Sequence, residues 1–159
     1  MIEGPYFVLV VAGVLGAALV AGVFCAFSAF VMKGLAALPA AQGVAAMRAV
    51  NVAAVTTAFM LLFLGSAVLC AVIAVVTVVV WPRAGGAELL VGSALYLSGA
   101  FGVTVAANVP RNEALARLDP GTPEAAAYWP GYVREWTRWN HVRTVASAGA
   151  ALAYVLALT

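Results

Sequence analysis

Charged residues are scarce in this chain. Asp, Glu, Lys and Arg make up 9% of its 159 residues, and hydrophobic residues make up 65%. Soluble globular domains carry roughly one quarter charged residues, so this composition excludes an ordinary soluble domain. The net charge of +2 is small, no lysine-rich run is present, and nucleic-acid binding is therefore not expected.

Several motifs of common enzyme classes are also missing. The sequence has no phosphate-binding glycine loop, no paired-carboxylate site, no Ser/His/Asp order and no CxxC pair, which argues against kinases, hydrolases and thiol redox enzymes. His141 is the single histidine, and first-row metals normally bind several such ligands. No metal or other cofactor is predicted, although the sequence remains compatible with one.

The few charges leave four long uncharged stretches, at 4–32, 49–82, 89–110 and 144–159. A helix that crosses a bilayer needs about 20 apolar residues, and a chain in lipid must satisfy its backbone hydrogen bonds internally. We therefore predict an all-α integral membrane protein. Residues 1–159 form one up-down-up-down four-helix bundle whose spans are about 5–32, 51–81, 88–109 and 139–158.

Two connections lie on the same side of this bundle, which we call the loop face (residues 33–50 and 110–138). Residues 35–50 are expected to form a short interfacial helix, and 110–138 a longer polar loop. Most cations lie there: Lys33, Arg48, Arg111, Arg117, Arg134 and Arg138. The positive-inside rule makes the loop face cytoplasmic and places both termini outside. Seven arginines against one lysine suggest a GC-rich genome. The expected location is the bacterial cytoplasmic membrane.

The start of the fourth span carries Trp136, Trp139, Asn140 and Arg143 at helical positions i, i+3, i+4 and i+7, which share one side of a helix. Val145 and other apolar residues occupy the opposite side and suit lipid. An arginine inside a span favours a functional role. The alternative is that Arg143 extends to the interface or pairs with a loop-face carboxylate.

The predicted topology brings polar residues of the other helices to the same depth, namely Ser28, Asn51, Asn108 and Asn112. Such convergence is typical of a ligand pocket, whereas each amide taken alone would be a helix cap. Phe24 and Phe27 share a helical face with Ser28 and are candidates for an apolar pocket wall. Their alternative role is an interfacial aromatic belt.

His141 is a candidate general base because its pKa normally lies near neutrality. Simple helical geometry, however, turns it by roughly 150° from the centre of the face that carries Trp136, Asn140 and Arg143. Two orientations of the imidazole therefore stay open, one towards the loop and one towards the same pocket.

The aromatic end of the first helix, the Asn108-x-Pro110-x-Asn112 element and the run Trp136-x-x-Trp139-Asn140-x-x-Arg143 together resemble the anthrone oxygenase-like family of small membrane proteins. The resemblance implies oxidation of polyketide anthrones to anthraquinones with molecular oxygen. On this analogy the substrate site is lined by Asn108, Asn112, Trp136, Asn140 and Arg143.

The working hypothesis is thus a membrane-embedded, cofactor-independent oxygenase for a flat aromatic substrate. Arg143 and the amides Asn108, Asn112 and Asn140 would stabilise an enolate, and His141 would act as the base. The substrate would contact Phe24, Phe27, Ser28, Asn51, Trp136 and Trp139. Two alternatives remain open: a non-catalytic binder or carrier of a quinone-like molecule, and a structural membrane subunit. The small-residue helices also suit a homo-oligomer.

Overall fold

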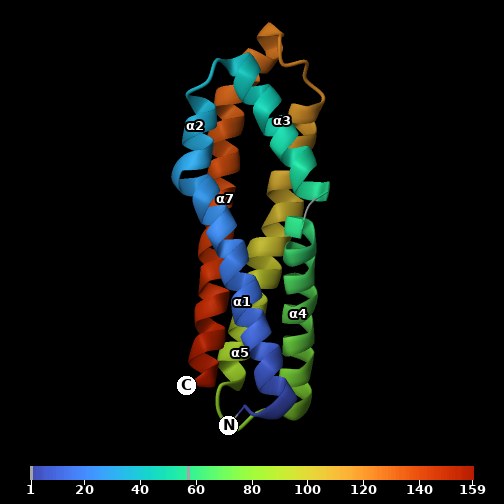
Figure 1. The fold of residues 1–159 in the computed structure, drawn as a ribbon, viewed down its shortest axis with the longest axis vertical. Coiled ribbons are helices and arrows are strands. Elements are labelled where there is room, and N and C mark those ends of the chain that lie inside the picture. Colours follow the sequence, from blue (N-terminus) through green and yellow to red (C-terminus); the bar gives the residue numbers. More distant parts are fainter. Residues whose placement is uncertain (1, 57) are drawn as a thin grey trace.

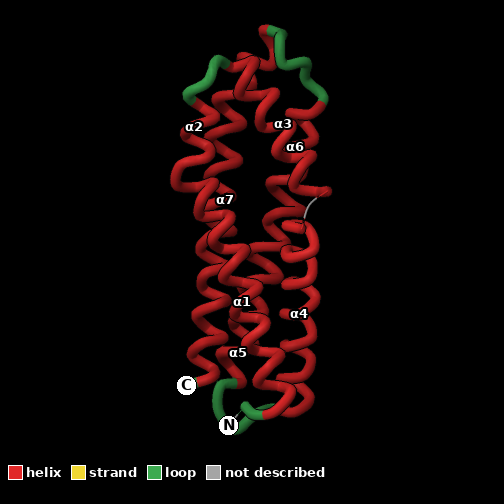
Figure 2. Tube along the Cα trace, in the orientation of Figure 1, coloured by secondary structure: helices red, strands yellow, loops and turns green. Residues whose placement is uncertain are grey.

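The computed structural model describes residues 2–56 and 58–159, in which no β-strand occurs. Helices run almost without interruption, and loops are confined to the two ends of the molecule (Figure 2). The first long helix comprises α1 (Gly4–Ala26), η1 (Phe27–Val31) and α2 (Met32–Ala36). It is followed by α3 (Ala40–Thr56) and α4 (Ala58–Val80), then α5 (Gly86–Ala94), η2 (Leu95–Gly102), η3 (Thr104–Asn108), α6 (Val109–Ala116) and finally α7 (Pro123–Leu158).

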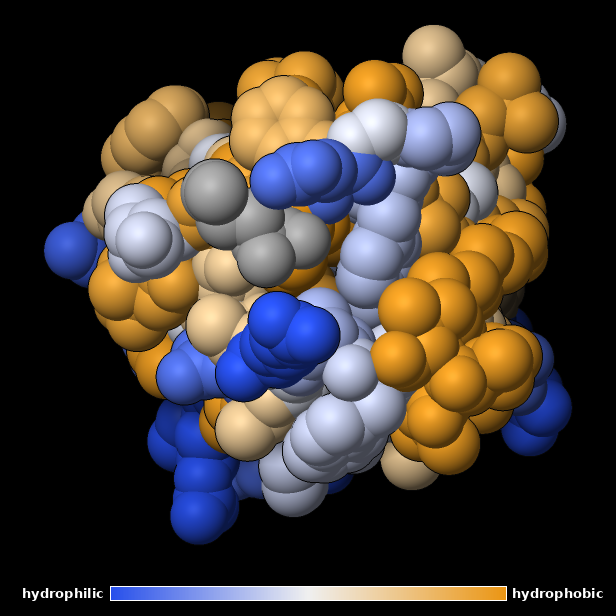
Figure 3. Space-filling view, turned by 90° about the horizontal axis from the view of Figure 1, so that it is seen from below, coloured by the Kyte–Doolittle hydropathy of each residue, from blue (hydrophilic) through white to orange (hydrophobic). Residues whose placement is uncertain are grey.

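Four of these continuous helices are long and apolar enough to cross a membrane: Gly4–Ala36, Ala58–Val80, Gly86–Ala116 and Pro123–Leu158. Both termini lie at one end of the bundle (Figure 1). The prediction of an all-α, four-span integral membrane bundle is therefore confirmed. Viewed from the end that carries the termini, hydrophilic residues gather over the middle, while hydrophobic residues occupy much of the surrounding surface (Figure 3).

Small residues let the helices approach closely in the half of the bundle nearer the termini. A Cβ atom added at Gly13 would lie 2.7 Å from Cδ1 of Ile73, and one added at Gly92 would lie 2.7 Å from the ring of Tyr154. The Tyr154 hydroxyl in turn forms a 2.9 Å hydrogen bond with Ser93. This is the packing that membrane helices use where the hydrophobic effect does not drive association.

The connection between the first two spans is more extensive than predicted. The helix expected within 35–50 is present as α3, but α3 continues to Thr56 and descends obliquely towards α4 (Figure 1). The predicted span 51–81 thus contains the end of α3 and all of α4, while residue 57 lies outside the described residues. Met47 and Val44 are fully buried and hold α3 against the rest of the loop face.

The polar connection 110–138, predicted as a longer loop, is largely helical. Residues 117–122 separate α6 from α7, and Thr122 caps α7 by accepting a 3.3 Å hydrogen bond from the backbone N–H of Ala125. The helices extend this far because apolar side chains on the loop face form a second core. This core contains Met32, Val44, Met47, Leu115, Trp129, Tyr132 and Trp136.

Pro110 does not end the third helix, which continues to Ala116, beyond the predicted end of the span at 109. Pro110 lies in the first turn of α6, a position where a helix tolerates a residue without a backbone N–H donor. The π-helical segment η3 precedes it. The helix axis therefore continues, and α6 carries Asn112 towards the interior of the loop face.

Candidate active site

A cavity of about 710 Å³ lies where the first helix, α3, α4, η3, α6 and α7 meet in the loop-face half of the bundle. Its volume falls within the range of about 300–1,000 Å³ that is usual for small-molecule sites. Six residues singled out in the sequence line it: Phe24, Phe27, Asn51, Asn112, Trp136 and Arg143. The structure thus brings together side chains that are up to about 120 positions apart in the sequence.

Arg143 is the centre of the site. Its side chain is buried, and its guanidinium carbon lies 4.2 Å from the ring centroid of Phe24 and 5.0 Å from that of Trp136. Nη2 donates a 2.6 Å hydrogen bond to Oδ1 of Asn140, and Nη1 donates a 3.2 Å bond to the hydroxyl of Thr104. The charge is thus held by aromatic faces and neutral dipoles.

No carboxylate forms an ion pair with Arg143 in the part of the chain that the structure describes. Its buried Nε also has no hydrogen-bond partner there. A buried cation without a counter-ion is costly, so proteins usually retain one where it binds something. The geometry does not match the alternative in which Arg143 extends to the interface or pairs with a loop-face carboxylate.

Asn140 fixes the position of Arg143. Its amide nitrogen donates to the backbone oxygen of Phe24 at 2.7 Å and to the hydroxyl of Ser28 at 2.8 Å. These bonds join α7 to the first helix at η1, a π-helical segment whose wider turn changes the register of backbone hydrogen bonding. Asn140 does not itself line the cavity, so it positions the arginine rather than touching a ligand.

Asn112 organises the other wall. Its Oδ1 accepts two hydrogen bonds of 2.9 Å, one from the hydroxyl of Tyr132 and one from Nε1 of Trp136. Among the described residues no hydrogen bond involves its amide nitrogen, and because Asn112 lines the cavity this nitrogen could donate to a ligand. Sequence reasoning missed Tyr132, although it lies four residues before Trp136 on the same face of α7.

The chain shares its last three helices with a known family. Residues 59–153 match the family model described as anthrone oxygenase. The chain belongs to the anthrone oxygenase family. The match covers Asn112, Asn140 and Arg143, whereas Phe24 and Phe27 lie before it. No curated protein and no solved structure matches the chain.

Five predicted site residues of this anthrone oxygenase family member do not line the cavity: Ser28, Asn108, Trp139, Asn140 and His141. Ser28 instead forms hydrogen bonds with Asn140 and Thr144 of α7. Asn108 is buried behind the wall, where its amide nitrogen donates a 3.3 Å bond to the backbone oxygen of Trp136 and its Oδ1 has no partner among the described residues. Trp139 is half-buried and does not line the cavity. His141 is exposed on the outer side of α7 and lines a separate groove.

His141 therefore does not lie with the other candidate catalytic residues. The reason is the helical period, which turns successive side chains by about 100° and so faces His141 away when Asn140 and Arg143 face inwards. Within the described residues, no group of three or more His, Cys, Asp or Glu side chains is placed to hold a metal ion.

Other residues of the cavity were not predicted. Glu113 is the only acidic side chain among its described lining residues, and it follows Asn112 directly in α6. Thr104, which binds Arg143, comes from the π-helical segment η3. The aromatic and basic lining residues that sequence reasoning did not place in the site are Arg48, Phe59 and Phe63. A single sequence offers no signal for these beyond their approximate depth in the bundle.

Proposed function

We propose that this protein is a membrane-embedded oxygenase that oxidises a flat aromatic substrate of the anthrone type with molecular oxygen in the cavity beside Arg143. Membership of the anthrone oxygenase family supports the reaction class. The observation that carries the proposal is Arg143 itself, a buried cation on an aromatic cavity wall with no described carboxylate partner.

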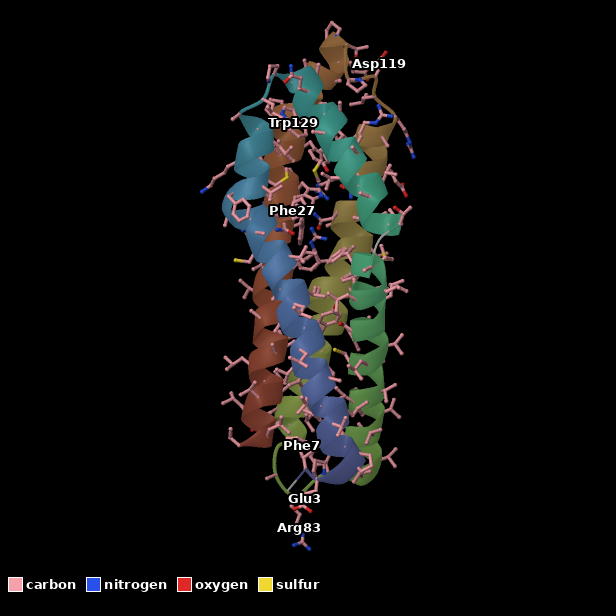
Figure 4. All side chains as sticks on the ribbon, in the orientation of Figure 1. Glu3, Phe7, Phe27, Arg83, Asp119 and Trp129 are labelled. Carbon is pink, nitrogen blue, oxygen red and sulfur yellow. The ribbon has the colours of Figure 1, made fainter. Side chains whose placement is uncertain are left out.

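The cavity wall suits a planar apolar molecule. Phe27 and Trp136 lie with ring centroids 5.6 Å apart on one side, and Phe59 and Phe63 stack at 5.9 Å. Phe27 lies in the loop-face half of the bundle, between the first helix and α7 (Figure 4). Aromatic faces bind a fused-ring substrate with little loss of conformational entropy, since few of their torsions are free.

Arg143 would supply the electrostatic part of the chemistry. Removal of a proton from the central CH₂ of an anthrone creates an enolate whose charge rests on the carbonyl oxygen. The guanidinium and the amide nitrogen of Asn112 could donate to that oxygen in a cavity whose lining is mostly apolar, where such bonds are stronger than in water. The carbanion form then transfers electrons to oxygen.

The overall reaction balances without a resident cofactor. The CH₂ carbon forms a bond to one oxygen atom of O₂, giving a peroxide, and loses its second hydrogen as the O–O bond breaks. One oxygen atom remains as the new quinone carbonyl, and the other leaves as water with the two hydrogens. Both C–H bonds of the CH₂ carbon are replaced by a C=O bond, and the two oxygen atoms of O₂ end in the carbonyl group and in water.

Glu113 replaces His141 as the proposed base. It is the acidic residue of the cavity lining, and no ion pair involves it among the described residues. Glu113 is exposed while it lines the cavity, so its carboxylate is placed where it could take a proton from a bound substrate.

The test measures oxygen uptake and quinone formation by the full chain, purified in detergent, with an anthrone as substrate. We expect Arg143→Gln to lower the rate by about 10²–10³-fold, as loss of an oxyanion donor does. Glu113→Gln should lower it by about 10²-fold or more. Arg117→Gln, which removes an exposed arginine outside the cavity, is the matched control and should retain the rate.

Three results would contradict parts of this proposal. Unchanged oxygen uptake in the Arg143 variant would remove the arginine from the reaction. A rate lost in His141→Gln but kept in Glu113→Gln would return the base to the histidine. Tight binding of the anthrone without any oxygen uptake would favour the alternative of a non-catalytic binder or carrier.

A further inference from the structure

A second concave site lies on the outer surface of the bundle, between the first helix and the amino-terminal half of α7. This groove has a volume of about 480 Å³ and is distinct from the cavity that holds Arg143. Arg134, Arg138 and His141 line it at positions i, i+4 and i+7 of α7, and Lys33 lines it from α2. The proposed oxygenase reaction uses none of these side chains.

The groove carries positive charge that the described residues do not neutralise. No Asp or Glu is among its described lining residues. Lys33 and Arg138 are exposed and take part in no described ion pair. Nε of Arg134 lies 3.6 Å from Oε1 of Glu135. The same carboxylate also pairs with Arg111, whose Nη2 lies 3.8 Å from Oε2. An anion is therefore the complementary ligand.

Neighbouring residues indicate the position of the groove relative to the membrane. On its side nearer the termini, the adjoining outer surface is apolar: Phe30 is 64% exposed and Val145 is 71% exposed. These side chains suit the hydrocarbon region of a bilayer. Lys33 and Arg138 lie just beyond them on the loop face, at the level where lipid headgroups begin. The floor between the cations includes the buried side chain of Met32.

We propose that this groove binds one anionic phospholipid, with its phosphate held between Lys33 and Arg138 and an acyl chain lying along the apolar surface at Phe30. Basic pockets at the membrane surface bind anionic headgroups through this combination of charge and apolar contact. Thr137 also lines the groove, and its buried hydroxyl has no hydrogen-bond partner among the described residues.

The same cations would also orient the chain in the membrane, so the test measures binding after insertion. The full chain is purified, stripped of lipid in detergent, and titrated by native mass spectrometry with palmitoyl-oleoyl phosphatidylglycerol. Phosphatidylcholine with the same acyl chains is the control for a lipid whose headgroup carries no net charge. Glycerol 3-phosphate is the control for a phosphate ester that has no acyl chain.

We expect the wild-type chain to retain phosphatidylglycerol in preference to phosphatidylcholine, and to show no comparable binding of glycerol 3-phosphate. The double variant K33Q/R138Q should bind phosphatidylglycerol about 30-fold more weakly, because each basic residue contributes about 1 kcal/mol to attraction of an anionic surface. The double variant R83Q/R117Q loses the same charge outside the groove and should bind as the wild type does.

Equal loss in both double variants would show a general charge effect and overturn the site, as would equal retention of the two lipids. Binding of glycerol 3-phosphate as strong as that of the lipid would overturn the assignment of the acyl chain. Matching thermal unfolding of the two double variants shows that a difference in binding does not come from misfolding.

Discussion

At the scale of single residues, the site depends on side chains that each do two things. Asn140 accepts from Arg143 and donates to the first helix, so that one amide both aims the guanidinium and joins two helices. Asn112 accepts from two aromatic donors and keeps its amide nitrogen for the cavity. Hydrogen bonds shared in this way hold the polar wall rigid in a site where unpaired groups are costly.

The shared acceptor leads to a stability prediction. Asn112→Ala leaves the hydroxyl of Tyr132 and the indole of Trp136 without their partner, and both side chains are buried. We expect a loss of about 2 kcal/mol in the free energy of unfolding, measured by denaturant titration in detergent. Adding Tyr132→Phe to Asn112→Ala should then cost little, because the hydroxyl has already lost its bond to Asn112. A full additional cost in the double variant would mean that the two residues are not coupled.

At the scale of elements, the π-helical segments are what the sequence does not reveal. The segment η1 contains Ser28, which accepts a hydrogen bond from Asn140. The segment η3 contains Thr104, which accepts a hydrogen bond from Arg143. A π-helical turn shifts the phase of every later side chain on that helix, and such turns occur often at functional sites. An ideal α-helical period therefore misplaces side chains of the third span relative to the cavity.

The close contact of η2 with α7 gives a prediction at this scale. A Cβ added at Gly99 would overlap with the Cβ of Ala146, whereas one added at Gly22 meets nothing within 4 Å. Gly99→Ala should destabilise the bundle by about 1–3 kcal/mol, the usual cost of overpacking. Gly22→Ala removes the same glycine flexibility without a clash and should be neutral or slightly stabilising. Thermal unfolding of both variants in one detergent provides the comparison, and equal melting temperatures would contradict the packing seen between η2 and α7.

At the scale of the whole molecule, the helices are longer than a bilayer requires. The 36 residues of α7 extend about 54 Å, against about 30 Å for the hydrocarbon core. The excess lies on the loop face, where the second hydrophobic core surrounds Trp129 and Tyr132. The proposed site is thus placed near the boundary between the membrane and the aqueous phase at the loop face, where an apolar substrate could arrive from the lipid.

The distribution of positive charge predicts the orientation of the chain in the membrane. Arg83 and Asp119 lie at opposite ends of the bundle (Figure 4). In a chain carrying Cys25→Ser and Cys70→Ser, we expect an impermeant maleimide added to intact cells to label Arg83→Cys but not Asp119→Cys, because the positive-inside rule predicts a cytoplasmic loop face. Permeabilised cells should show labelling of both. Labelling of the Asp119 site alone in intact cells would reverse the orientation.

The amino-acid sequence by itself determined the four-span bundle and the side on which its polar residues gather. Both follow from contiguous features, since hydrophobic runs mark the spans and charges mark the connections between them. Helical spacing in α7 also identified the inward face that carries Trp136, Asn140 and Arg143, because a period of 3.6 residues holds along that helix.

Only the tertiary structure decided which residues share the cavity. It placed His141 and Trp139 away from it and Asn108 behind its wall, and it brought in Glu113 and Phe59. These placements depend on how six helical segments rotate and tilt against one another, and on the π-helical turns that alter their phase. Contacts of this kind join residues far apart in the chain, so no local pattern in one sequence encodes them.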